Sequence, residues 1–177
     1  SSTARLMTRC RPSSGLDDMA RYWGFWTRGK LDLLRRYLDA FTTASKNQSE
    51  IVYLDLFGGQ PQNRERLTEA DLDGSARIAL ATSDAPFATR LRSALGADFA
   101  GRDFEVVAGD CNLTIRTTLA SLASVNWAPT FAFVDPNGPD VHWSTLEAIS
   151  KFLSPSLTKP EIWLLLAAGM FIRTLRI

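Results

Sequence analysis

A nearly unbroken apolar run at residues 51–57, interrupted only by Asp55 and followed by two glycines, constrains the fold more than any other feature of this chain. Such a run is typical of a strand that is buried on both faces of a parallel sheet. Residues 104–108 and 130–134 repeat the pattern, and each is followed by an aspartate with a glycine close by. Residues 162–166 are a fourth strand candidate.

Helical patterns separate these runs. The spacing predicts a helix from Thr27, a suitable N-cap, to about Ala44. Its apolar residues recur every three or four positions and form one stripe: Leu31, Leu34, Leu38 and Phe41. The aromatic residues that crowd its entrance are Trp23, Phe25 and Trp26, and we expect them to pack into the core more readily than to serve a ligand.

Two further helices follow later in the chain. Asn112 is expected to cap a helix that runs to about Ser124. Ser144 and Glu147 have the spacing of a capping box, which predicts a helix from there to Leu153.

Strands that alternate with helices indicate an α/β fold with a mostly parallel, doubly wound sheet. The length of 177 residues fits one domain. We therefore expect a loose basic arm over residues 1–20 and a single α/β domain over residues 21–177. A sheet of this kind, of the Rossmann-like type, places its ligands outside the carboxyl ends of its strands.

One strand of the expected sheet is not visible in the sequence. Between the first run and residues 104–108, residues 76–97 show the pattern of two helices separated by Pro86-Phe87. Either the sheet has fewer strands than expected, or residues are absent from this numbering near Phe87-Ala88. We favour the second explanation, because the sequence pattern changes abruptly there without the residues that are typical of a turn. The sequence also stops directly after the fourth strand, so we expect the far edge of the sheet to be missing.

Composition excludes several classes of protein. Hydrophobic residues make up 45% and charged residues 22%, which is ordinary for a globular domain. Two cysteines and one histidine offer neither a disulfide framework nor a zinc set, so we expect no metal site. The most apolar run, residues 162–172, is too short to cross a bilayer, and no signal-peptide pattern is present. We expect a cytoplasmic protein with no membrane partner.

The net charge of +1 gives no general reason to expect a polyanionic partner, but the charge is uneven. Residues 1–36 carry eight basic residues against three acidic ones. This basic end is compatible with contact to nucleic acid. A solvated arm and helix face would explain it equally well.

Polar and small residues follow the first strand in the sequence Asp55-Leu56-Phe57-Gly58-Gly59-Gln60-Pro61. The glycines would let the backbone approach a ligand closely. The turn lacks the G-x-G-x-x-G spacing of dinucleotide-binding folds. It resembles the first motif of class I methyltransferases, whose turn holds the methionine part of S-adenosylmethionine; the alternative is a purely structural turn at the strand end.

A second cluster follows the strand at residues 104–108 and reads Gly109-Asp110-Cys111-Asn112. In the same resemblance this position lies beside the adenine, where Asp110 would accept a hydrogen bond from the exocyclic amine. The alternative is that Asp110 and Asn112 cap the next helix, which is an adequate explanation for Asn112, and both roles are compatible.

The third cluster follows residues 130–134 and reads Asp135-Pro136-Asn137-Gly138. It resembles the catalytic turn of amino-group methyltransferases. A nitrogen that is to be methylated must present its lone pair to the sulfonium methyl, and a carboxylate with a nearby carbonyl can accept its N–H bonds and aim it. A β-turn with Pro at its second position and Gly at its fourth explains the turn, but not the acid at the tip of a buried strand.

In this order the motifs resemble the three-cysteine-motif partner family over roughly residues 22 to 150. The resemblance implies a Rossmann-like class I methyltransferase fold, S-adenosylmethionine as cofactor and a three-cysteine-motif protein as candidate partner, and it implies little about the substrate. Nucleic acid is a further candidate partner, because of the Asp135-Pro136-Asn137-Gly138 turn and the basic N-terminal end. The resemblance assigns catalysis to Asp135, Pro136, Asn137 and Gly138. It assigns the cofactor to Lys30, Asp55, Phe57, Gly58, Gly59, Gln60, Asp110 and Cys111.

Two readings of function follow. The first is a methyltransferase that acts on an amino nitrogen of nucleic acid or of a modified base. The second is a non-catalytic or degenerate module that binds a three-cysteine partner, because the expected strand with an acid for the ribose hydroxyls is not visible. Lys30 is either a contact to the carboxylate of the cofactor or a plain solvated lysine, and Gly74-Ser75 is expected to cap a helix that begins at Ala76.

Overall fold

The structure is a computed structural model that describes residues 6–7, 22–23, 25–58, 62–65, 68, 70–75, 78–79, 105–107, 109–136, 140–153 and 159–166. The predictions for Gly59, Gln60, Asn137 and Gly138, and for the gap near Phe87-Ala88, lie outside these residues.

A parallel sheet of three strands forms the centre of the fold. Strands β3 (Val52–Asp55), β7 (Thr130–Val134) and β8 (Glu161–Leu164) lie in the order β3-β7-β8. All three were predicted, and β8 begins one residue earlier than expected. All residues of β3 and β7 are buried, because helices cover both faces.

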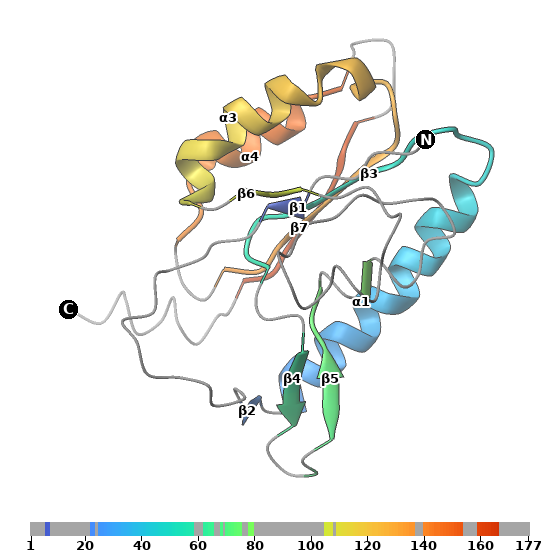
Figure 1. Cartoon of the computed structure of the whole chain (residues 1–177), viewed down its shortest axis with the longest axis vertical. Coiled ribbons are helices and arrows are strands. Elements are labelled where there is room, and N and C mark those ends of the chain that lie inside the picture. The colour runs from blue at the N-terminus through green and yellow to red at the C-terminus, as the bar shows by residue number, and fades with distance from the viewer. Residues whose placement is uncertain are drawn as a thin grey trace.

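The helices form one layer on each side of this sheet (Figure 1). Helix α1 (Phe25–Ala44) lies on one side, and helices α3 (Cys111–Ser121) and α4 (Trp143–Ser150) lie on the other. Strand residues alternate between the two layers. Val52, Leu54, Ala132 and Val134 pack with α3 and α4, whereas Tyr53, Phe131 and Phe133 pack with α1. The expectation of a mixed α/β fold with a parallel sheet is therefore confirmed.

Helix α1 begins at Phe25, two residues before the predicted cap at Thr27, and ends at Ala44 as predicted. Its predicted stripe is buried throughout. The expectation that Trp26 packs into the core is wrong, because its side chain is 76% exposed. Among the α1 residues whose burial is described, the buried stripe starts at Leu31, so Trp26 lies before it.

The caps of α3 and α4 differ from the predictions. Asp110, not Asn112, caps α3, and its Oδ1 accepts a hydrogen bond of 2.9 Å from the backbone N–H of Asn112. Helix α3 ends at Ser121, and a short 3-10 helix, Ala123–Val125, follows. Helix α4 is capped by His142 without a side-chain bond, so Ser144 lies inside the helix and the capping box is wrong.

In the part of the chain that the structure describes, five short strands lie outside the central sheet. Strands β4 (Gln62–Glu65) and β5 (Asp71–Asp73) pair antiparallel, and β2 (Tyr22–Trp23) pairs with β4. Strand β6 (Val106–Val107), from the predicted run at residues 104–108, pairs in parallel with β1 (Leu6–Met7). Strand β1 also contacts β3, so it lies between β3 and β6.

None of the helices in the described part of the chain has the length and hydropathy that a membrane span needs.

Candidate functional site

Two carboxylates lie at the carboxyl ends of the neighbouring strands β3 and β7. Asp55 is the last residue of β3 and pairs with Phe133 of β7. Asp135 lies two residues beyond Phe133, so strand alternation directs both side chains to the face that α1 covers. The parallel register thus brings the first and third predicted motifs to one edge and one face of the sheet.

Helix α1 contributes a cation to this edge. The ammonium of Lys30, in the second turn of α1, donates to Oδ2 of Asp135. The side chains are 13% and 27% exposed, so the pair is largely shielded while one side of Asp135 stays open to solvent. The alternative of a plain solvated lysine is therefore wrong for Lys30.

Asp55 is fully buried and bonded on one side only. The hydroxyl of Ser75, itself buried, donates to Oδ2 of Asp55 at 2.5 Å. Within the described part of the chain, Oδ1 of Asp55 and the hydroxyl of Tyr53 are buried and accept or donate no hydrogen bond. Unsatisfied buried polar atoms are costly, so two of them on one strand face mark an unusual place in the core.

Sequence reasoning missed the role of the Ser75 side chain. Gly74-Ser75 was expected only to cap a helix, and a helical bond of 3.0 Å does run from the N–H of Ile78 to the carbonyl of Gly74. The serine hydroxyl, however, fastens this helical turn to the tip of β3 through Asp55. No local pattern signals a bond between two elements that are 20 residues apart.

Burial raises the pKa of Asp55 from 3.8 to about 7. The hydrogen bond from Ser75 lowers it, the charge of Asp135 raises it, and the Phe57 backbone and Lys30 lower it by smaller amounts. The pKa of Tyr53 is raised well above 10.0, first by burial and then by the charges of Asp55 and Asp135. Near neutral pH, Asp55 therefore exists in both protonation states, as titrating groups in functional sites often do.

This shift predicts how stability depends on pH. Because the pKa of Asp55 is higher in the folded chain than in the unfolded one, its contribution to the free energy of unfolding is complete below about pH 4 and is lost as the pH rises through about 7. An Asp55→Asn variant keeps an acceptor for Ser75 but cannot ionise. We expect it to gain stability relative to the unmodified chain between pH 5 and about 8, measured by urea unfolding. A difference that stays constant over this range would contradict the assignment.

The other predicted cofactor residues have mainly structural contacts. Gly58 is buried, and Phe57 is partly buried and packs against the α3–α4 side of the core. Cys111 is also buried on that side, at 2% exposure. Asp110 caps α3 and is partly exposed. Of the predicted catalytic residues other than Asp135, Pro136 is described and is buried.

Asn112 connects α3 to the loop that precedes α4. Its side-chain N–H donates to the carbonyl of Asp140 at 2.8 Å. Its side-chain oxygen accepts from the N–H of His142 and the hydroxyl of Thr145, both at 2.8 Å. This junction fixes the chain that leaves the Asp135 turn, a role that the capping prediction did not include.

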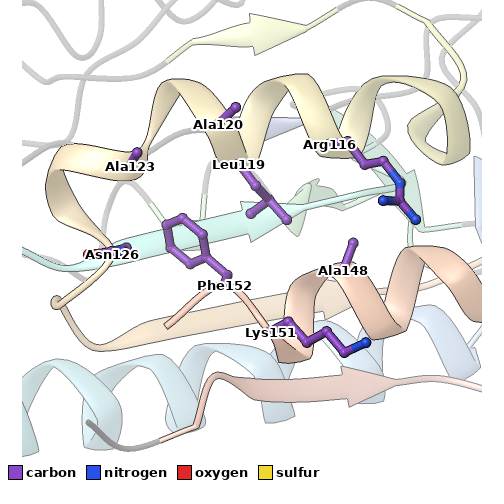
Figure 2. A pocket seen from close by; sticks show the side chains of 8 residues that line it. All are labelled: Arg116, Leu119, Ala120, Ala123, Asn126, Ala148, Lys151 and Phe152. Carbon is purple, nitrogen blue, oxygen red and sulfur yellow. The ribbon is translucent and has the colours of Figure 1, made fainter. Parts of the chain in front are cut away.

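A surface hollow between α3 and α4 lies elsewhere (Figure 2). Its lining comes from the second half of α3, the 3-10 helix and the end of α4, namely Arg116, Leu119, Ala120, Ala123, Asn126, Ala148, Lys151 and Phe152. These segments lead into the starts of β7 and β8, so the hollow is at the opposite edge of the sheet from Asp55 and Asp135. It contains no predicted site residue. Among the described residues, no group of three or more His, Cys, Asp or Glu is placed to hold a metal ion.

Comparison with known proteins adds no assignment, because no family model, no curated protein and no solved structure matches this chain.

Proposed function

We propose that the carboxyl edge of β3 and β7 binds S-adenosylmethionine, and that the protein methylates an amino nitrogen of nucleic acid or of a modified base. The resemblance of the motifs to the three-cysteine-motif partner family motivates this proposal. The observation that carries it is the meeting of Lys30, Asp55 and Asp135 on one face of two neighbouring parallel strands.

The strand order supports a ligand at this edge. The chain leaves β3, forms β6 on the side of β1, and then returns to form β7 on the other side of β3. The connection that leaves β7 runs through α4 to β8 on the far side, so the connections from β3 and from β7 diverge at the carboxyl edge. Open α/β sheets bind their ligands at such a switch point. Asp55 and Asp135 flank it.

The residues present suit a cationic cofactor beside a target amine. Two carboxylates lie near one lysine, and a buried oxygen of Asp55 has no hydrogen-bond partner among the residues that the structure describes. When bound, the cofactor supplies a methyl group that is already activated on a sulfonium. Asp135 would accept an N–H bond of the target with the oxygen that Lys30 does not hold, and Lys30 holds the carboxylate in a fixed orientation. The hydrogen bond from Ser75 to Asp55 fixes the carboxyl end of β3, from which the chain continues into the glycine turn.

Calorimetric titration with S-adenosylmethionine tests the cofactor half of the proposal. We expect saturable heat at cofactor concentrations up to the high micromolar range, and none from NAD or ATP. The absence of heat from S-adenosylmethionine would overturn the proposal. Heat from NAD or ATP alone would instead indicate another nucleotide-binding enzyme.

The pKa of about 7 for Asp55 adds a pH-dependent readout to this titration. A bound sulfonium favours the ionised carboxylate, so binding should release a proton from Asp55 when it is protonated. We therefore expect affinity to rise between pH 6 and about 8, and the heat to depend on the ionisation enthalpy of the buffer. The Asp55→Asn variant is the matched control and should lose the buffer dependence. If its titration keeps the dependence, another group takes part.

A non-catalytic module that binds a three-cysteine partner is the second candidate. The observation in its favour is that Lys30 already occupies Oδ2 of the predicted catalytic carboxylate. Stable co-purification with a three-cysteine protein, without methyl transfer to any amine substrate, would favour this candidate over the enzyme.

A further inference from the structure

The most exposed large apolar side chain of α1 among the described residues lies one turn from Lys30 of the candidate site. Trp26 is 76% exposed in the first turn of α1, four residues before Lys30. Residues four apart lie on one helix face as neighbours, and the Cα–Cβ bonds of a helix tilt toward its N-terminus. The Lys30 side chain, which bonds Asp135, therefore starts about one turn from the indole.

Other exposed apolar residues surround the same edge. Helices α3 and α4 begin where the chain leaves β6 and β7, and α1 ends where it enters β3, so the first turns of all three helices lie toward the carboxyl edge. The exposed large apolar residues at helix starts or at the end of β8 are Trp26, Leu113, Trp143 and Leu166. Ligand sites commonly combine an apolar surround with a few polar groups at the centre.

We propose that Trp26 is the stacking surface for a nucleobase of single-stranded nucleic acid, and that the exocyclic amine of this base reaches Asp135. The inference rests on the proposed function and names its substrate class. A solvent-open indole offers a flat π face on which a base can stack. Asp135 keeps one side open to accept the N–H of the amine.

The charge of Lys30 selects against aliphatic amines. An aliphatic amine is protonated near neutral pH, so it would bring a second positive charge against the Lys30 ammonium on the same carboxylate. A protonated amine also has no lone pair to accept a methyl group. The exocyclic amine of adenine or cytosine is neutral and planar, and it avoids both difficulties.

The charge of the surrounding helix fits a phosphate backbone. Arg28 and Arg36 are exposed on α1, and residues 1–36 carry eight basic residues against three acidic ones. Cationic side chains near a stacking surface are the usual combination in proteins that bind single strands.

Binding of fluorescent single-stranded oligonucleotides, measured by anisotropy with S-adenosylmethionine present, tests the inference on the full chain. We expect Trp26→Ala to weaken binding roughly five- to 150-fold, the range of one lost stacking contact. Trp26→Phe should recover part of the affinity. Trp127→Ala is the matched control, because Trp127 is 40% exposed just before β7, at the opposite edge; its affinity should stay within about twofold.

Cofactor binding separates this inference from the function on which it rests. The Trp26 variants should bind S-adenosylmethionine as the unmodified chain does and keep its circular dichroism. Methyl transfer should occur on oligonucleotides of adenine or cytosine and not on thymine, which lacks an exocyclic amine. The inference is overturned if Trp26→Ala binds the oligonucleotide normally, or if a lysine peptide is the better methyl acceptor. Failure of the unmodified chain to bind the cofactor overturns both proposals.

Discussion

Replacement of Asp135 by alanine is expected to lower methyl transfer at least on the order of a hundredfold while leaving the affinity for S-adenosylmethionine nearly unchanged. The carboxylate aims the target amine, and misplacement of a reacting atom by about 1 Å can cost this much in rate. Single-turnover transfer from labelled cofactor measures the chemical step, and calorimetry measures the affinity.

Asp135→Asn is the control for folding. Asn keeps an oxygen that can accept from Lys30 and from the target amine, so it should retain part of the transfer rate and most of the stability. Alanine leaves the Lys30 ammonium, which is only 13% exposed, without its carboxylate, and some loss of stability is expected. Normal transfer in the alanine variant would remove Asp135 from the mechanism. Equal unfolding of both variants would show a structural role instead.

Phe131→Ala is expected to produce the largest loss of stability, about 3–5 kcal/mol. Phe131 is fully buried in β7, and its ring lies 5.1 Å from Tyr37, 5.7 Å from Phe41 and 5.8 Å from Tyr53 and Trp163, centroid to centroid. The substitution removes a ring of β7 that contacts aromatic residues of α1, β3 and β8. In a domain of this size the midpoint of thermal unfolding should fall by roughly 6–20 °C.

Leu113→Ala provides the comparison for this variant. Leu113 is 79% exposed, so its truncation should change the free energy of unfolding by less than about 0.5 kcal/mol. Chemical unfolding of both variants by circular dichroism would give the two values. Similar losses in both would mean that the aromatic cluster does not hold the layers together.

The central sheet could be predicted because its signal is local. Each of β3, β7 and β8 is a short apolar run, and burial on both faces requires that composition wherever the run lies in the chain. Helix α1 was predicted for the same reason, from the spacing of Leu31, Leu34 and Leu38. Its start was misplaced because Thr27 looks like a cap, whereas the backbone is already helical at Phe25.

Strands β4 and β5 gave no such signal. The residues of β4 are Gln, Asn, Arg and Glu, a polar set with low strand propensity. Pairing between Gln62 and Asp73 holds them, and that pairing is a property of tertiary structure rather than of either segment.

The candidate site was predicted only in part. The aspartates at strand ends could be located because the runs that precede them are clear. The bond from Lys30 to Asp135 spans 105 residues and the bond from Ser75 to Asp55 spans 20, so no pattern within either segment reveals them. The exposure of Trp26 was missed because the sequence does not show whether an aromatic side chain at the start of a helix faces the core or the solvent.

The pairing of β1 with β6 has a consequence for the order in which the chain assembles. Leu6 lies opposite Val106, so during synthesis β1 has no partner until about a hundred more residues have been made. Closing so long a loop is slow and adds little to the nucleus of folding. We expect α1, β3 and the β7–α4–β8 unit to form the early nucleus and β1 to dock late. The edge of β3 that β1 contacts would then stay without its neighbour in the nascent chain longer than any other part of the described sheet.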